Sequence, residues 1–171
     1  NINRVPPPTS AMKWKHVALK EQLREGIVAL AETRWLPAEK NEFAEMLPAA
    51  MIYSTEYPCQ LYYGGQRRGG VALIIPNGLG LLVEALRILV PGYVLRLKMK
   101  RPGSELTWVV YVVYLPPREQ IETLEAWEKE EHDIPPVGVD VITVAVGDLN
   151  MDGELGTGTR SQRRLRALLE D

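Results

Sequence analysis

The chain has 171 residues, of which 46% are hydrophobic and 25% charged, so it is long enough to bury one substantial core. Its formal net charge of -2 excludes the strongly basic field that draws many proteins onto nucleic acid. The single cysteine, Cys59, excludes an internal disulfide and a thiolate zinc cluster. The apolar runs are shorter than the ~18 residues of a membrane helix, and no signal peptide opens the chain. We therefore expect a soluble, intracellular and monomeric protein that does not contact a membrane.

The first half of the chain predicts two helices among short strands. Residues 12–25 carry apolar side chains at roughly helical spacing, and Gly26 follows them as a stop signal. Residues 27–31 are typical of a short buried strand, which ends at Glu32 and Thr33. The next expected elements are a short helix within residues 37–47 and strands at residues 50–54, 60–63 and 71–75.

The second half predicts a hairpin and then an alternation of strands and helices. Arg96, Lys98 and Lys100 alternate with apolar residues, the period-2 pattern of a strand with one face in solvent. Residues 101–104, Arg-Pro-Gly-Ser, are typical of a hairpin turn. The remaining expected elements are a central strand at 107–114, a helix at 118–131, a strand at 139–146 and a helix at 161–170. Together these elements predict one domain over residues 1–171, an α/β sandwich with two mixed β-sheets flanked by helices.

Polar side chains gather where several of the expected strands end. They are Glu32, Tyr114, Asp148 and Asn150, with Asn1 and Asn3 near the first apolar segment. Ligands bind outside such strand ends in α/β sheets, because the backbone turns there and releases side chains into a crevice. Carboxylate and amide oxygens suit Mg²⁺, which takes only one or two protein carboxylates. Glu32 and Asp148 fit that role, and capping of strand ends is the equally weighted alternative.

Five segments, in this order, resemble motifs of the endonuclease/exonuclease/phosphatase family. They are residues 1–3 (Asn-Ile-Asn), 31–35 (Ala-Glu-Thr-Arg-Trp), 69–72 (Gly-Gly-Val-Ala), 113–117 (Val-Tyr-Leu-Pro-Pro) and 147–150 (Gly-Asp-Leu-Asn). In its overall sequence pattern, the chain is most similar to the apurinic-type endonuclease domains of non-LTR retrotransposons. The resemblance implies hydrolysis of a phosphodiester, with DNA the favoured substrate and Mg²⁺ the cofactor, or Mn²⁺ in its place.

The resemblance also implies a role for each residue that matches a motif. Glu32 would bind the divalent metal, with Asn1 nearby. Tyr114 would contact the scissile phosphate and Asp148 would orient or activate the attacking water. The other implied contacts with substrate are those of Asn150 with a phosphate oxygen, and of Asn3 and Arg118 as weaker candidates.

The chain also departs from the family pattern. Family members end with a Ser-Asp-His strand, and this chain stops at Asp171 without one. Its histidines, His16 and His132, do not match that motif, so both are expected at the surface. Because the chain also opens at Asn1 rather than Met, we expect a domain truncated at both ends, lacking its C-terminal strand or strands, with weak activity or none. The alternatives are a catalytically dead remnant or interaction module of the same fold, and a phosphatase or phosphodiesterase acting on RNA or phospholipid head groups.

Three other patterns have competing interpretations. Residues 148–153 fit the first half of a calcium loop, but position twelve is Thr159 and the preceding residues are strand-like. Two glycine pairs at 64–65 and 69–70 flank basic residues, which suits a phosphate loop less well than a hairpin tip. Four arginines, Arg160, Arg163, Arg164 and Arg166, form a local basic cluster that fits either a nucleic-acid contact or a solvated helix face.

Overall fold

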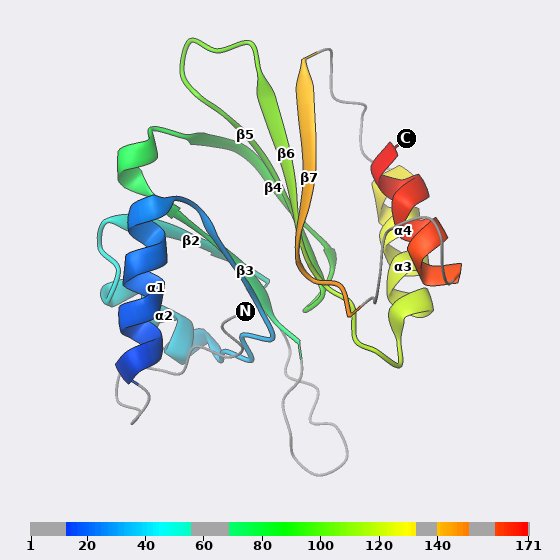
Figure 1. Cartoon of the computed structure of the whole chain (residues 1–171), viewed down its shortest axis with the longest axis horizontal. Coiled ribbons are helices and arrows are strands. Elements are labelled where there is room, and N and C mark those ends of the chain that lie inside the picture. Colours follow the sequence, from blue (N-terminus) through cyan, green and yellow to red (C-terminus); the bar gives the residue numbers. More distant parts are fainter. Residues whose placement is uncertain (1–12, 56–68, 133–139, 151–159, 171) are drawn as a thin grey trace.

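The computed structural model describes residues 13–55, 69–132, 140–150 and 160–170. Two β-sheets pack face to face, and a pair of helices covers the outer face of each sheet (Figure 1). This arrangement confirms the α/β sandwich that the sequence predicts. The strand expected at residues 60–63 lies outside the described residues. Among the described helices, none combines the length and the apolar character needed to cross a membrane.

The first sheet has three strands, with β3 (Val71–Pro76) in the centre. Both β1 (Val28–Ala31) and β2 (Ala50–Ser54) pair with it in antiparallel register. Helices α1 (Lys13–Glu25) and α2 (Pro37–Glu45) cover its outer face. The apolar run of β3 is buried on both faces, which explains why it shows no alternation. The side chains buried under the two helices are Leu19, Val28, Leu30, Trp35, Phe43, Leu47, Ala72 and Ile74.

The second sheet has four strands in sequence order. It runs from β4 (Leu82–Val90) through β5 (Val94–Lys100) and β6 (Thr107–Tyr114) to β7 (Val141–Asp148). The first three strands are antiparallel, whereas β7 is parallel to β6, so the sheet is mixed. Helix α3 (Gln120–His132) lies between β6 and β7 in the chain, and with α4 (Arg160–Glu170) it covers the outer face of the sheet. The core there consists of Leu89, Val90, Val94, Val109, Tyr111, Val113, Leu115, Leu124, Trp127 and Leu165.

A third core lies between the two sheets. Alternate residues of each strand point into it, because successive side chains of a strand face opposite sides of the sheet. The central strands β3, β5 and β6 supply most of this core. Its buried members are Ala31, Val71, Leu73, Ile75, Leu95, Leu97, Met99, Val110, Val112 and Tyr114.

The solvent-facing position predicted for Arg96 is wrong, because α3 covers that face of β5. The Arg96 side chain is only 6% exposed, and its Nε lies 3.5 Å from Oε1 of Glu131 on α3. The Tyr111 hydroxyl accepts a hydrogen bond from Arg96 at 3.3 Å and donates one to Glu131 at 2.7 Å. A buried charge is tolerated only when it is paired and hydrogen-bonded, and both conditions are met here.

The other two basic residues of β5 match the sequence prediction. The side chains of Lys98 and Lys100 are 34% and 38% exposed, and both contact Glu84 on the neighbouring strand β4. Their Nζ atoms lie 3.2 and 2.5 Å from the Glu84 carboxylate. The hydrogen bonds from Lys100 and Lys98 lower the pKa of Glu84. The charged face of β5 is therefore exposed to solvent toward its C-terminal end and buried near its middle.

The raised pKa of the Tyr111 hydroxyl predicts that the fold loses stability in alkaline solution. Burial raises its pKa from 10.0 to about 12, and the hydrogen bond to Glu131 adds to this effect. Because the folded-state pKa is above the unfolded value, the contribution of Tyr111 is complete below pH 10 and is lost as the pH rises through about 12. In urea unfolding, we expect Tyr111→Phe to lower the free energy of unfolding by about 1 kcal/mol at neutral pH and to lessen its fall above pH 10. An unchanged pH dependence in the variant would contradict this assignment.

Gly147 lets β7 pack closely beside β6, directly before Asp148. Its φ is +138°, and a Cβ at this position would lie 2.0 Å from the carbonyl oxygen of Val113. We expect Gly147→Ala to destabilise the fold by more than about 3 kcal/mol, because a backbone atom cannot move aside. The matched control is Gly80→Ala, at a glycine with φ +62° and no atom within 4 Å of the added Cβ. This control should cost only about 1 to 2 kcal/mol in thermal or urea unfolding, and equal losses in the two variants would exclude a steric cause.

Candidate active site at the strand ends

Glu32 and Tyr114 meet across the two sheets. Glu32 directly follows β1 in the first sheet, and Tyr114 is the last residue of β6 in the second. The Tyr114 hydroxyl donates a short hydrogen bond to Oε1 of Glu32. Tyr114 is buried and Glu32 is partly buried, with 20% of its side chain exposed. The structure therefore brings together two of the residues that the sequence singles out at strand ends.

The backbone that carries Glu32 is held in an uncommon conformation. Glu32 and Arg34 have φ values of +52° and +54°, a region that residues with a Cβ rarely occupy. The N–H groups of Thr33 and Arg34 donate to the carbonyls of Gly70 and Gly69 at 2.9 and 3.0 Å, which fixes this path. Residues in such conformations persist only where the surroundings hold them, and they gather at functional sites.

The glycine pair Gly69-Gly70 packs against the Glu32 segment. A Cβ on Gly70 would lie 2.3 Å from the Thr33 hydroxyl oxygen, and Gly70 has a φ of +88°. Its N–H donates to the carbonyl of Gly92 at 2.8 Å. The close approach explains why glycine is needed here. The phosphate-loop and hairpin-tip interpretations both depend on residues 64–68, which lie outside the described residues.

Arg34 is the site residue that sequence reasoning missed. Its Nη2 lies 2.8 Å from Oε2 of Glu32, so the two oxygens of the Glu32 carboxylate have different partners. The Arg34 side chain is 26% exposed, and its Nε is buried without a hydrogen-bond partner among the described residues. The sequence held no signal for this contact, because it depends on the positive φ angles of Glu32 and Arg34, which residue spacing does not reveal.

Asp148 and Asn150 lie next to Tyr114 because β7 runs parallel to β6. Tyr114 is opposite Asp148 in the register, and the N–H of Leu115 donates to the Asp148 carbonyl at 2.9 Å. The side-chain amide of Asn150 donates to the Leu115 carbonyl at 2.8 Å, and its backbone N–H donates to Oδ1 of Asp148 at 3.2 Å. Gln120 of α3 donates to the Asn150 carbonyl at 2.7 Å. These bonds hold the end of β7 beside the end of β6.

Burial and the neighbouring charged groups shift the pKa of the Tyr114 hydroxyl. Burial and the hydrogen bond to Glu32 raise the pKa of Tyr114 well above its usual value, and the negative charge of Asp148 adds to this shift. The positive charge of Arg34 opposes it. The hydroxyl therefore keeps its proton at neutral pH and acts as a hydrogen-bond donor.

The donor set fits a magnesium-type site better than a zinc-type site. Within the described parts of the chain, no group of three or more His, Cys, Asp or Glu side chains is placed to hold a metal ion. Mg²⁺ needs only one or two protein carboxylates and takes water or phosphate oxygens for the rest. Glu32 and Asp148, at adjoining strand ends, are oxygen donors of that kind.

The other residues expected at the site are less informative. Asn1 and Asn3 lie outside the described residues. Arg118 is exposed in the turn that follows β6, and none of the described hydrogen bonds or ion pairs involves it. His132 is exposed at the end of α3, as predicted, whereas the side chain of His16 lies outside the described residues.

The structure also bears on the calcium-loop and basic-cluster interpretations of the C-terminal third. The residues before Asp148 form strand β7, not the helix that an EF-hand calcium loop needs, while residues 151–159 lie outside the described chain. Arg164 on α4 pairs with Glu125 at 2.9 Å and also with Glu128, both on α3. Arg160 lies 3.8 Å from Glu125. At least two arginines of the cluster therefore belong to ion pairs between helices.

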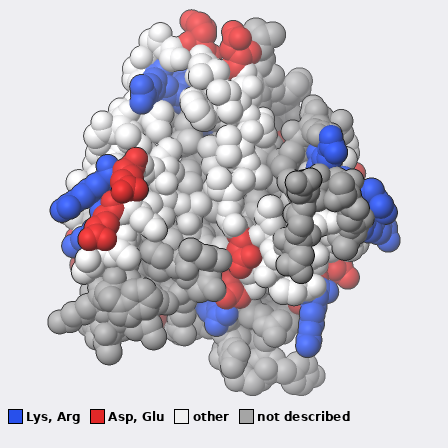
Figure 2. Space-filling model, in the orientation of Figure 1, with Lys and Arg blue, Asp and Glu red and all other residues white. Residues whose placement is uncertain are grey.

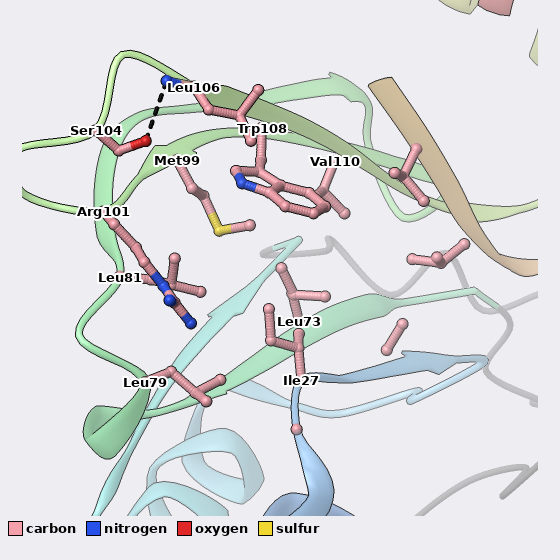
Figure 3. A pocket seen from close by; sticks show the side chains of 14 residues that line it. Ile27, Leu73, Leu79, Leu81, Met99, Arg101, Ser104, Leu106, Trp108 and Val110 are labelled. Carbon is pink, nitrogen blue, oxygen red and sulfur yellow. Dashed lines mark hydrogen bonds between the residues drawn. The ribbon is translucent and has the colours of Figure 1, made fainter. Parts of the chain in front are cut away.

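A large apolar cavity lies between the sheets, and it is not lined by Glu32, Tyr114 or Asp148 (Figure 3). Its volume is about 700 Å³, and it adjoins the start of β1 at Ile27 and the start of β6 at Trp108. Arg101 and Ser104 are its polar lining residues. The cavity contains no acidic or nucleophilic cluster, so the strand ends remain the candidate site for hydrolytic chemistry.

No family model matches the sequence, and no curated protein matches it. Solved structures match its fold. An endonuclease/exonuclease/phosphatase family protein from Bacteroides thetaiotaomicron matches 98% of this chain and 66% of its own, with a TM-score of 0.65 and 11% identity. A mannosyl-6-phosphatase from B. thetaiotaomicron VPI-5482 matches 98% of this chain and 68% of its own, with a TM-score of 0.61 and 12% identity.

A third match is TDP2 from D. rerio, in complex with a single-strand DNA product. It covers 85% of this chain at a TM-score of 0.54 and 13% identity. The chain spans 62%, 57% and 54% of the length of three TDP2 chains. At such low identities the likeness concerns the fold. This chain therefore has the fold of the endonuclease/exonuclease/phosphatase family.

Proposed function

We propose that this chain carries the site of a metal-dependent phosphoester hydrolase, with a DNA phosphodiester as the favoured substrate and Mg²⁺ or Mn²⁺ as the cation. The observation that carries the proposal is the meeting of Glu32, Tyr114 and Asp148 at adjoining strand ends of two sheets. The fold supports it, because it is shared with a mannosyl-6-phosphatase and with TDP2.

The residues of the site suit distinct tasks in such a hydrolysis. Glu32 would hold the cation, with Asn1 as a second candidate ligand, and the bound cation would offset the negative charge of the phosphoryl group. The Tyr114 hydroxyl, which stays protonated at neutral pH, would donate to a phosphate oxygen. Asp148 would accept a hydrogen bond from the attacking water and so orient it.

The end of β7 supplies a further candidate donor. Asn150 has a φ of +47° and is tied to the chain after β6 through its side-chain amide. One N–H of that amide is used in this bond, so the other would face a phosphate oxygen of the substrate. Asn3 and Arg118 would contact substrate beyond the reacting phosphate.

Two lines of support favour DNA over other phosphoesters. The sequence as a whole is most similar to the nuclease domains of non-LTR retrotransposons, and one matched structure contains a single-strand DNA product. On the face of the molecule drawn in Figure 2, the charged groups of the described residues lie in small separate clusters, with uncharged residues between them. Binding of DNA would therefore depend on local contacts at the strand ends more than on an extended basic surface.

A second candidate function is a catalytically inactive module of the same fold. The contacts of the Glu32 carboxylate favour it, because both oxygens already have partners within the chain. None of the described hydrogen bonds of Glu32, Tyr114 or Asp148 involves a histidine, a common acid-base group in hydrolases.

Nicking of supercoiled plasmid in Mg²⁺ tests the proposal. We expect Glu32→Gln and Asp148→Asn each to lower the rate by about 100-fold or more, because each removes a charge at the reacting phosphate. Glu84→Gln is the matched control, since Glu84 pairs with lysines of β5 outside the site and should leave the rate unchanged. Equal nicking by the chain and its two site variants would exclude this site as the source of the activity. No nicking by any of them would favour the inactive module or a different phosphoester.

A further inference from the structure

Arg34 forms its ion pair with Glu32 through one guanidinium nitrogen, Nη2. Arginine and carboxylate form their most favourable contact as a fork, with two parallel hydrogen bonds to the two oxygens. Here the described contact of Arg34 is with Oε2, whereas Oε1 accepts a hydrogen bond from the Tyr114 hydroxyl. The pair therefore holds the guanidinium through a single described contact.

The same guanidinium has an unused donor. Its Nε is buried, and no acceptor for it lies among the described residues. A buried donor without an acceptor is unfavourable. By contrast, the buried Arg96 uses its Nε to reach both Tyr111 and Glu131. Arg164 on α4 shares this feature within ion pairs between helices, so it is the place of Arg34 beside Glu32, with a donor still unused, that points to a second position for its side chain.

The charge at Glu32 gives the reason for a second position. A divalent cation that binds Glu32 would stand beside a guanidinium that already occupies one carboxylate oxygen. Two cations at one carboxylate repel each other, so binding of the metal and retention of the Arg34 contact are opposed. A phosphate group brought to the same strand ends is an alternative partner that accepts the guanidinium in its preferred fork geometry.

We propose that Arg34 is an exchangeable counter-ion of Glu32. It neutralises the carboxylate while no metal is present, leaves it when a divalent cation binds, and then contacts the phosphate group of the substrate. The inference rests on the proposed function, because it takes Glu32 as the residue that holds the cation. It assigns to Arg34 the binding of substrate phosphate, and to the Glu32–Arg34 pair a control of metal affinity.

Titration with Mn²⁺, followed by the electron paramagnetic resonance signal of the free ion, tests the first half. With the metal-free chain, we expect Arg34→Gln to tighten Mn²⁺ binding by roughly 3- to 10-fold, because the competing cation is removed. Arg34→Lys keeps a competing charge and should bind Mn²⁺ within about twofold of the parent chain. Arg160→Gln removes an equal charge at a side chain that is 73% exposed, and it should also have little effect.

Binding of inorganic phosphate at saturating Mn²⁺ tests the second half. We expect Arg34→Gln to weaken phosphate binding by roughly 10-fold, because a charged fork is lost, and Arg160→Gln to leave it unchanged. Tighter Mn²⁺ binding together with weaker phosphate binding in Arg34→Gln supports the exchange. Mn²⁺ affinity that is unchanged or weaker overturns it, and so does unchanged phosphate binding. Circular dichroism and thermal unfolding of each variant exclude loss of the fold as the cause.

A Glu32→Gln variant separates this inference from the proposed function. If Glu32→Gln binds Mn²⁺ as the parent chain does, the metal assignment fails and the exchange fails with it. If Glu32→Gln loses Mn²⁺ while Arg34→Gln matches the parent chain in both titrations, only the role of Arg34 is overturned. The metal site of the proposed function then remains supported.

Discussion

The hydrogen bond between Tyr114 and Glu32 is the interaction on which the candidate site depends. Each sheet has its own outer core under its own pair of helices, and a third core joins the two sheets. The strand ends of the two layers form one site only where they are joined. Tyr114 makes that connection because its ring belongs to the core between the sheets, while its hydroxyl reaches the carboxylate that follows β1.

Two clusters in this chain each contain an arginine, a glutamate and a tyrosine, but they differ in how completely their polar atoms are hydrogen-bonded. Arg96, Tyr111 and Glu131 form a closed set in which the guanidinium is buried and contacts both partners, and this set fastens α3 to the sheet. At the strand ends, Arg34 and Glu32 lie on strained backbone, and a buried donor has no described acceptor. A fully satisfied cluster favours one structure, whereas an incompletely satisfied one is easier to rearrange. The uncommon backbone conformation at Glu32 and Arg34 is the feature that marks the second cluster as functional.

The sequence predicted the strands whose pattern is set by local preference, and it failed where tertiary contacts decide. β3 and β6 are rich in β-branched residues and bounded by turns, and both were found as expected. β4 was not predicted, because its Leu, Glu, Ala and Arg residues suit a helix equally well and only pairing with β5 makes it a strand. Strand-end arguments located Glu32, Tyr114 and Asp148, but the partners of Arg96 and Arg34 come from other elements or depend on positive φ angles, which spacing does not reveal.

The seam between the sheets is packed unequally along its length, and this has a colloidal consequence. An apolar cavity opens along it, and Ile27 and Trp108, which line this cavity, are each more than a third exposed. Among the described strands, β7 forms the adjoining edge of its sheet, and an uncovered edge is a template for pairing with another chain. A net charge of -2 gives little repulsion between molecules, so apolar contacts at this seam contribute to the second virial coefficient of the chain in solution. Attraction between molecules should be strongest in mildly acidic solution, where the net charge passes through zero.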